Sequence, residues 1–349
     1  MADSIEIRGL YKIFGARAGD FVPAVKRGIG KAELNETSSH VLALKDINIA
    51  MPAGGITVVM GLSGSGKSTL IRHINRLIEP TIGEVLVDGI DVCRMSPAEL
   101  RGFRRSRTAM VFQKFALLPH RTVLENTVYG LDIQGVARPD GLAKARRWIE
   151  RVGLSGFEDH YPNQLSGGMQ QRVGLARALA TDADILLMDE AFSALDPLIR
   201  VGMQTMLLEL QRELKKTVVF ITHDLDEALR LGDRIAILRD GEVVQQGSGE
   251  DIVLKPVDDY ISAFVREVSR ARVIRAGAVM TPRPAPPGSP AITIDTVIES
   301  AARTMIEAGA TAAQVIDASG QPVGSIEMTA TMAAMVTPVG DPRRFDALQ

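Results

Sequence analysis

The chain has 349 residues, 46% of them hydrophobic, which is ordinary for a packed soluble protein and too long for one average domain. Its formal net charge of −2 argues against nucleic acid as a partner, because proteins that bind nucleic acid usually carry a basic excess. No apolar run approaches the roughly 20 residues that span a bilayer, and the first residues lack the basic and apolar regions of a signal peptide. We therefore expect a cytosolic chain. Its single cysteine, Cys93, is expected to be a small packing residue.

The N-terminal segment predicts three strands and one interruption. Ile5–Leu10 alternates apolar and charged residues as an edge strand does, and the Tyr-Lys-Ile-Phe-Gly that follows is expected to end it in a turn. Residues 16–40 are rich in glycine, lysine and small polar residues without strong periodicity, so we interpret them as an insertion whose role the sequence does not indicate. Val41–Met51 and Gly55–Met60 predict strands, the second of them an unbroken apolar run typical of a strand buried on both faces.

The middle of the chain predicts helices followed by alternating strands and helices. Ser96-Pro-Ala-Glu99 has the serine, proline and glutamate of a capped helix start, and the arginine-rich stretch 101–107 is interpreted as a solvated helix face. Between about 114 and 165 the pattern is mostly helical, and Trp148 lies there among apolar residues at helical spacing, which favours a core position. Strand-like runs occur at 108–112, 185–188, 218–221 and 235–238. This order predicts a layered α/β domain with a helical insertion.

The composition changes near Arg275. The proline-rich stretch Thr281–Pro290 cannot continue a helix or a central strand, so we expect a linker or a long loop. After it, strand-like runs at 292–295, 313–316 and 323–326 and a helix-like run at 297–308 predict a small α+β unit.

A glycine-rich segment, Gly61-Leu-Ser-Gly-Ser-Gly-Lys67-Ser68-Thr69, directly follows a buried strand and opens a helix, which is the context that a P-loop requires. Glycines let the backbone N–H groups turn inward around phosphates, and the helix N-terminus adds partial positive charge. Lys67 is expected to reach the β- and γ-phosphates of ATP, and Ser68 to ligate Mg²⁺. A merely flexible glycine loop is the alternative. The ATP-binding residues predicted here are Gly61, Leu62, Ser63, Gly64, Ser65, Gly66, Lys67, Ser68 and Thr69.

Two further strands end in polar residues. The run 185–188 leads into Asp189 and Glu190, which taken alone could be solvated strand-end charges. Beside a P-loop we expect Asp189 to hold Mg²⁺ through its water shell and Glu190 to orient or deprotonate the attacking water, as a catalytic residue. A second such strand, 217–222, ends in His223, which we expect to contact the γ-phosphate as a second catalytic residue, although a strand-end histidine can also be structural. The four other histidines are interpreted as surface or structural residues.

The segment Leu165-Ser-Gly-Gly-Met-Gln-Gln, just before a helix, resembles the signature of the ABC family of ATPases. The resemblance implies a P-loop cassette with a RecA-like core, an antiparallel β subdomain and a helical subdomain at about 114–165. It implies a head-to-tail homodimer in which each signature docks on the ATP that the partner subunit holds. Phe14, or alternatively Tyr11, would stack on adenine, unless this aromatic simply packs. The other residues implied are Gln113 as sensor of nucleotide and Mg²⁺, the signature residues Ser166, Gly167, Gly168 and Gln170, and the interface loop Ser193, Ala194, Leu195 and Asp196.

Three longer phrases resemble the ATPase subunits of glycine betaine and proline (quaternary amine) importers: Asn75-Arg-Leu-Ile-Glu-Pro-Thr, Glu190-Ala-Phe-Ser-Ala-Leu-Asp-Pro-Leu-Ile-Arg, and Thr222-His-Asp-Leu-Asp-Glu-Ala. The resemblance covers about the first three-quarters of the chain. It implies a peripheral subunit on the cytoplasmic face of the cell membrane that energises uptake through a separate permease, with an extracytoplasmic binding protein carrying the cargo. The apolar run 115–119 would face the permease or, equally, pack in the core.

Other interpretations remain open at this point. The cargo could be choline, histidine or another amino acid, and a soluble ABC ATPase of translation or DNA repair is a further alternative, although the chain shows neither a second cassette nor extended heptads. We expect the cassette at 1–270. In 271–349 we expect a linker and a regulatory region, because 279–337 resembles one degenerate copy of the paired cystathionine-β-synthase-type (CBS) repeats found in the importer family. Whether that region senses ionic strength or a nucleotide is not evident.

Overall fold

The computed structural model of this chain describes residues 4–113, 115–266 and 268–336. They form two compact units. The first covers the chain up to Asp224 together with Leu231–Val244, and the second comprises Leu225–Arg230 and the chain from Gln245 onward. This division falls earlier than the boundary expected near residue 270. Each unit is described separately below.

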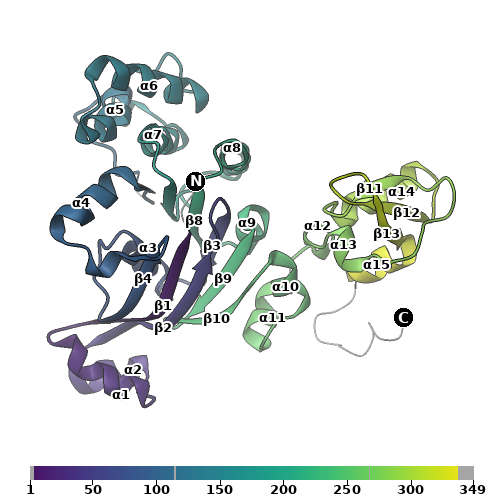
Figure 1. Cartoon of the computed structure of the whole chain (residues 1–349), viewed down its shortest axis with the longest axis horizontal. Coiled ribbons are helices and arrows are strands. Elements are labelled where there is room, and N and C mark those ends of the chain that lie inside the picture. The colour runs from purple at the N-terminus through teal and green to yellow at the C-terminus, as the bar shows by residue number, and fades with distance from the viewer. Residues whose placement is uncertain (1–3, 114, 267, 337–349) are drawn as a thin grey trace. The chain divides into compact units, whose positions relative to one another are not determined.

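The first unit is built on a mainly parallel sheet of six strands, in which β9, β3, β8, β7 and β6 pair in parallel with their neighbours (Figure 1). Every residue of β3, β7 and β8 is buried, as the apolar runs predict for strands covered on both faces. Because the strands are parallel, their carboxyl ends meet at one edge. In order across the sheet the strands are β10 (Glu242–Gly247), β9 (Arg234–Arg239), β3 (Ile56–Met60), β8 (Thr217–Thr222), β7 (Ile185–Asp189) and β6 (Thr108–Val111).

A second, antiparallel sheet packs against the first through a shared apolar core, to which Leu44, Val59, Leu70 and Leu187 belong. Its strand order is β2 (Val41–Met51), β1 (Ile5–Phe14), β4 (Ile82–Val87) and β5 (Ile90–Asp91).

Two expectations for β1 were wrong. The strand lies inside the antiparallel sheet between β2 and β4, so it is not an edge strand, and it continues through the segment expected to turn. Its pairing with β2 shifts register between Ile7 and Leu10 and again between Leu10 and Lys12, and Gly9 has a φ of 50° there. Such irregularities interrupt the apolar and polar alternation without ending a strand. The broken alternation therefore imitates a strand end.

Helices surround the first unit, and several begin as the sequence predicts. Ser96 and Glu99 form the predicted capping box at the start of α4. A second capping box, which was not predicted, is formed by Thr122 and Glu125 at α5. Trp148 packs among apolar residues of the helical segment, where α5, α6 and α7 lie together (Figure 1). These helices are α3 (Lys67–Ile74), α4 (Pro97–Ser106), α5 (Val123–Gln134), α6 (Arg138–Arg151), α7 (Gly167–Ala180) and α8 (Pro197–Leu214). The helix α9 (Leu225–Leu231) begins just after β8, and its residues Leu225–Arg230 are counted with the second unit.

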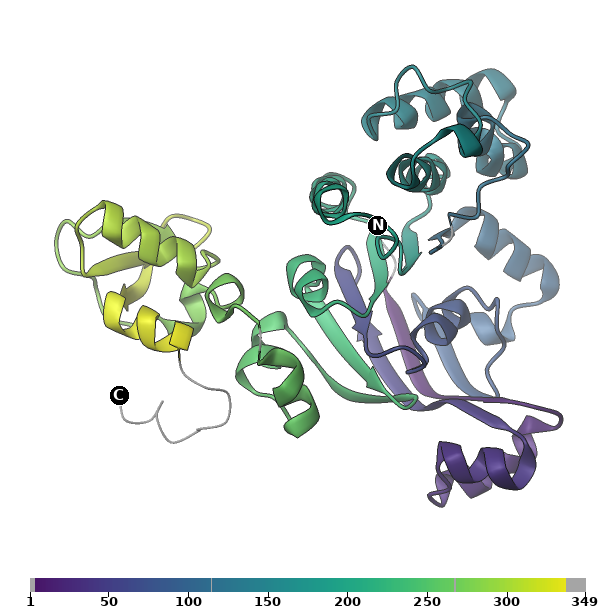
Figure 2. The ribbon, with the colours of Figure 1, turned by 180° about the vertical axis from the view of Figure 1, so that it is seen from behind.

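The insertion at 16–40 contains a 3-10 turn (Ala18–Phe21) and two short helices, α1 (Val22–Lys26) and α2 (Lys31–Ser38), which Figure 2 shows as the purple helices beside β1 and β2. Helices this short have little stability alone, so their sequences carry only weak periodicity. They are held by packing: Leu34 of α2 is buried in a cluster with residues of α1, β1 and β2.

The second unit is a small α/β assembly. Its three-stranded sheet has the order β11-β12-β13, with β11 parallel and β13 antiparallel to β12. Residues 282–290 form neither helix nor strand, in agreement with their proline content, and residues 337–349 of the predicted regulatory region lie outside the described part. The elements are α10 (Gly249–Leu254), α11 (Asp259–Val265), α12 (Arg270–Val273), α13 (Ala276–Val279), β11 (Ala291–Thr293), α14 (Ile298–Glu307), β12 (Ala312–Ile316), β13 (Pro322–Glu327) and α15 (Met328–Val336).

In the part of the chain that the structure describes, no helix combines the length and the apolar character needed to cross a membrane.

Candidate nucleotide-binding site

The glycine-rich loop joins the end of β3 to the start of α3, and two of its glycines have no room for a side chain. Gly61 and Gly66 have φ values of 151° and 104°. A Cβ at Gly61 would lie 2.2 Å from the carbonyl oxygen of Leu238, and one at Gly66 would lie 2.7 Å from that of Ala43. Only glycine fits these positions. The loop therefore turns tightly into the N-terminus of α3, the arrangement that binds phosphates in P-loop proteins.

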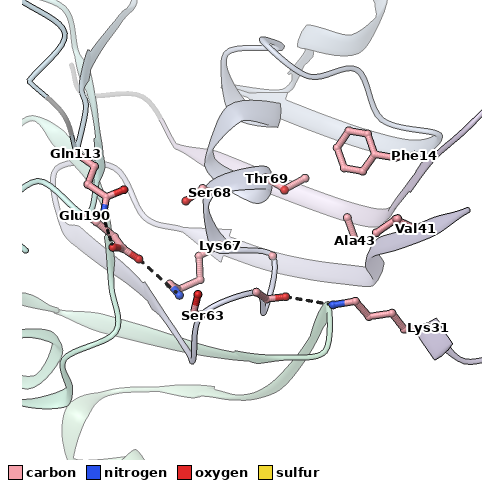
Figure 3. Close-up of a pocket in the computed structure, with 12 residues that line it drawn as sticks. Phe14, Lys31, Val41, Ala43, Ser63, Lys67, Ser68, Thr69, Gln113 and Glu190 are labelled. Atoms are coloured by element: carbon pink, nitrogen blue, oxygen red, sulfur yellow. Dashed lines mark hydrogen bonds and ion pairs between the residues drawn. The ribbon is translucent and has the colours of Figure 1, made fainter. Parts of the chain in front are cut away.

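A cavity of about 430 Å³ opens beside this loop (Figure 3). It is lined by residues that are far apart in the sequence: the end of β1, the start of β2, the P-loop, and the loops that follow β6 and β7. The lining residues are Phe14, Lys31, Val41, Ala43, Ser63, Gly64, Gly66, Lys67, Ser68, Thr69, Gln113 and Glu190.

The side chain of Lys67 is buried and lines the cavity. Its ammonium donates hydrogen bonds to the carbonyl oxygens of Gly61 (2.8 Å) and Leu62 (3.0 Å) and lies 3.8 Å from Oε1 of Glu190. Burial lowers the pKa of this ammonium, and the charges of Glu190 and Asp189 oppose the shift. The side chain is thus a point charge at the loop, the property with which a P-loop lysine binds phosphate.

Ser68 and Asp189, the two residues predicted to hold Mg²⁺, are in direct contact. The hydroxyl of Ser68 donates to Oδ1 of Asp189 at 2.7 Å, and Arg72 lies 3.2 Å from the other carboxylate oxygen. Asp189 is buried at the carboxyl end of β7. Hard oxygen donors of this kind suit Mg²⁺, which takes one or two protein ligands and completes its shell with phosphates and water. The donor set therefore fits that ion.

Glu190 lies where three strand ends converge. Its Oε2 accepts a hydrogen bond from the side-chain amide of Gln113, which follows β6, at 2.9 Å, and lies 3.7 Å from Nδ1 of His223, which follows β8. Its backbone has a φ of 47°, a strained conformation for a residue other than glycine. The sheet thus assembles a carboxylate, an amide and an imidazole from loops that the sequence separates. His223 stands next to Glu190 but outside the residues that line the cavity.

The loop after Glu190 links the cavity to α8. The hydroxyl of Ser193 donates to the carbonyl oxygen of Glu190 at 2.9 Å, and the carboxylate of Asp196 caps α8 by accepting from the N–H of Ile199 at 3.1 Å. Leu195 is buried, whereas Ala194 and Asp196 are exposed. Of the four residues predicted at a subunit interface, these two offer their surface to solvent.

The signature segment lies elsewhere in the first unit. Ser166 caps α7, its hydroxyl accepting from the N–H of Met169, and beside it Gly167 is exposed and Gly168 is partly exposed. Gln170 instead donates to the carbonyl oxygen of Leu165 at 3.2 Å. Among the described residues that line the cavity, none comes from the signature. The role expected for the signature, docking on a nucleotide held by a partner subunit, stays a prediction.

The structure separates the two aromatic candidates. Phe14, at the end of β1, lines the cavity with 40% of its surface exposed, and the ammonium of Lys12 lies 4.8 Å from its ring centroid. Tyr11 is buried and packs with the insertion. Phe14 is the one of the two that is placed to stack on a bound base.

The cavity is also lined by three residues that the sequence did not predict there: Lys31, Val41 and Ala43. Val41 and Ala43 begin β2, and Val41 pairs with Phe14 across the antiparallel sheet. Pairing of the two strands could have suggested these positions. Lys31 comes from the insertion, and its sequence environment gives no comparable signal.

The family model described as ABC transporter matches residues 44–193. The glycine betaine/proline betaine transport system ATP-binding protein ProV of Salmonella typhimurium is 52% identical over 276 residues, which are 79% of this chain and 69% of that protein. The trimethylamine N-oxide transport system ATP-binding protein TmoW of Ruegeria pomeroyi is 42% identical over 323 residues, 93% of this chain and 94% of that protein.

Solved structures of ABC transporter cassettes resemble the fold of this chain. The dimeric structure of the bacterial ABC transporter cassette MJ0796 superimposes with a TM-score of 0.60 at 34% identity, covering 70% of this chain and 98% of that one. A post-hydrolysis state of the same cassette, described as bound to ADP and Pi, superimposes equally well. The P-loop cavity, the two-sheet core and these likenesses converge on one family. The chain is an ABC ATPase and belongs to the ABC transporter family, among the ATP-binding subunits of transport systems that include ProV.

Proposed function

We propose that this chain energises the import of glycine betaine, proline betaine or a related amine through a separate permease, as a homodimeric ATPase on the cytoplasmic face of the membrane. The observation that carries the proposal is the single cavity at which the P-loop, Phe14, Gln113 and Glu190 meet. Identity of 52% with ProV supports the transport class. An extracytoplasmic binding protein carries the cargo in this proposal, and the ATPase does not touch it.

In this mechanism the backbone N–H groups of the loop and the Lys67 ammonium bind the β- and γ-phosphates, and Phe14 stacks on adenine. Ser68 and Asp189 would hold Mg²⁺, which when bound would neutralise charge on the phosphates. Glu190 accepts the proton of the attacking water, and Gln113, already hydrogen-bonded to it, keeps the carboxylate turned toward the γ-phosphate. His223 contacts that phosphate from the neighbouring strand end.

Two such sites close between two subunits, each completed by the partner's signature. ATP binding closes the dimer and hydrolysis reopens it, and the movement reaches the permease through the segment that follows Gln113. Within that segment Ala116 and Pro119 are exposed, whereas Leu117 packs against the helical core. In this proposal the exposed residues of the run face the permease, while Leu117 belongs to the core.

One observation favours a second cargo. TmoW of Ruegeria pomeroyi matches 93% of this chain and 94% of its own length, so its likeness covers more of both chains than that of ProV, which matches 79% and 69%. Trimethylamine N-oxide is therefore the second candidate.

The experiment that separates the cargoes is uptake by proteoliposomes containing the full chain and the permease encoded beside it, supplied with the neighbouring binding protein. Glycine betaine, trimethylamine N-oxide, choline and histidine are compared as labelled solutes. ATP-dependent uptake of glycine betaine supports the first proposal, and selective uptake of trimethylamine N-oxide supports the second. ATP hydrolysis that never depends on the permease would contradict both.

A further inference from the structure

The insertion brings one side chain to the nucleotide cavity. Lys31 is the first residue of α2 and lines the same cavity as the P-loop and Phe14. Its ammonium donates to the carbonyl oxygen of Gly64, within the P-loop, at 3.3 Å (Figure 3). A segment that interrupts the cassette between two strands therefore reaches the loop that binds phosphate.

Lys31 is held at this place by the packing of α2. Leu34, one helical turn later and thus on a neighbouring part of the helix surface, is 1% exposed and packs with Val22, Val25 and Leu42. The end of the insertion is fixed by His40, whose ring nitrogens lie 2.7 Å and 2.8 Å from the carbonyl oxygens of Ser38 and Ala16. The backbone of α2 is thereby anchored to the sheet, while the Lys31 side chain remains exposed.

The charge of Lys31 is not neutralised by a neighbour. Its partner is a neutral carbonyl, and in the described part of the chain no ion pair involves Lys31. The other charged residues that line the cavity, Lys67 and Glu190, lie 3.8 Å apart and offset one another. An uncompensated ammonium on a flexible stem beside a phosphate-binding loop is attracted by a polyphosphate, and it can turn from the weak carbonyl contact toward that ligand.

We propose that Lys31 is a further nucleotide-binding residue, whose ammonium leaves the Gly64 carbonyl and binds a phosphate oxygen of ATP at the P-loop. The inference rests on the proposed nucleotide site and gives the insertion a role in it. In Figure 3 Lys31 lies on the far side of the P-loop from Glu190 and Gln113. It therefore strengthens ATP binding without taking part in the activation of water.

The test compares the affinity of the full-length chain for ATP and for adenosine, by competition against a fluorescent ATP analogue, in Lys31→Ala, Lys31→Gln and Lys31→Arg. Arg27→Ala is the matched control, because it removes the same charge from an exposed residue of the same insertion outside the cavity lining. Thermal unfolding of each variant shows that it is folded. We expect the two neutral variants to bind ATP about tenfold more weakly, since hydrogen bonds to a charged group have about this strength. The arginine variant should retain most of the affinity.

Adenosine distinguishes a phosphate contact from a structural effect, because it keeps the base and ribose and lacks the charge. Its affinity should be unchanged in all variants, and kcat at saturating ATP should stay within about twofold of the original. Equal affinity for ATP in the original chain and in both neutral variants would overturn the inference while leaving the P-loop site standing. An equal loss for ATP and adenosine would also overturn it. An original chain that fails to bind ATP would contradict the nucleotide site itself.

Discussion

At the scale of single residues, the chemistry depends on groups whose neighbours the sheet supplies. Glu190 has a strained backbone and a carboxylate shared between Gln113 and His223, although the three residues follow three different strands. Its side chain is largely buried at the rim of the cavity, 3.8 Å from the Lys67 ammonium. A carboxylate in this position can take a proton from water next to the phosphate that Lys67 holds.

The variant Glu190→Gln keeps the size of the side chain and removes its capacity as a base. We expect hydrolysis to fall by at least about a hundredfold while ATP and Mg²⁺ remain bound, so that the closed dimer accumulates. Size-exclusion chromatography with and without ATP measures whether the dimer accumulates. The matched control is Glu209→Gln, which changes an exposed residue. A variant that stays monomeric in ATP, or hydrolyses at the original rate, would show that another group is the catalytic carboxylate.

His73 gives a pH dependence of stability. It lies within α3 with no exposed surface, its Nδ1 donates to the carbonyl oxygen of Thr69 at 2.7 Å, and burial lowers its pKa to about 4. The unfolded chain, with an ordinary pKa near 6.5, therefore binds more protons than the folded chain between these values. The contribution of His73 to the free energy of unfolding should therefore be fully present above pH 6.5. The free energy of unfolding should decrease as the pH falls toward 4, by at most about 1.4 kcal/mol per pH unit.

The matched variant is His73→Asn, whose amide can still donate to Thr69 but does not titrate. Chemical unfolding of both proteins between pH 4 and 8 measures the effect. Because all other acid-sensitive groups are shared, the difference in unfolding free energy between the two should change with pH only through this histidine. Parallel curves would show that His73 is not the buried neutral group that the structure describes.

At the scale of elements, the N-terminus of α7 is the feature that the proposed dimer explains. Ser166 caps this helix, Gly167 beside it is exposed, Gly168 is partly exposed, and none of the three is among the described residues that line the cavity. An exposed serine and glycine helix start offers hydrogen-bond donors to an anion. In the head-to-tail dimer that we propose, that anion is the nucleotide of the partner subunit.

Mixing two inactive subunits tests this geometry. Lys67→Ala removes phosphate binding and Ser166→Arg blocks the signature, so each homodimer should lose nearly all ATPase activity, while Ser166→Arg subunits still bind ATP. A dimer of one subunit of each kind contains one intact composite site and should regain measurable activity. A dimer of an original subunit with a subunit carrying both substitutions contains none. The two mixed dimers are purified before assay, because original homodimers in the second mixture would be active. Equal activity of the two purified mixed dimers would contradict the sandwich, and Ser166→Ala controls for the loss of the helix cap.

At the scale of the whole molecule, the nucleotide motifs and the C-terminal region belong to different compact units. The second unit has its own core, in which Ile274, Ile298, Met305 and Val315 are buried, and Leu254 of α10 packs against it. Loss of the residues after Arg270 should therefore disturb α10 and leave the first unit folded.

A chain ended after Arg270 should keep ATP binding and hydrolysis, because every predicted nucleotide contact precedes Asp224. We expect its transport to lose a dependence on ionic strength that the full chain has, since exposed charge contacts weaken as the Debye length falls from about 10 Å at 0.1 M salt to about 3 Å at 1 M. Transport in proteoliposomes across a salt series measures it. Superimposable curves would contradict a sensing role, and loss of all ATPase activity would show that the cassette extends beyond Arg270.

Much of this molecule could be predicted from local patterns. The buried strand before Gly61, the capping box at Ser96 and the apolar spacing around Trp148 each depend on neighbours within a few residues, and backbone geometry and hydrophobic burial act over that range. The P-loop and the acidic end of β7 could be recognised for the same reason. The placement of β1 and the end of its strand could not, because bulges break the alternation and the neighbouring strand β4 lies about 70 residues away in the sequence.

By itself, the sequence determined the family, and it predicted the phosphate-binding loop and the strand-end carboxylates, because these are contiguous motifs with a local physical meaning. Only the tertiary structure decided that Phe14 and not Tyr11 faces the cavity, that Gln113 reaches Glu190, and that Lys31 of the insertion lies against the P-loop. These contacts depend on strand register and on the packing of short helices whose own periodicity is weak. Such information resides in the pairing of distant segments, which no local pattern records.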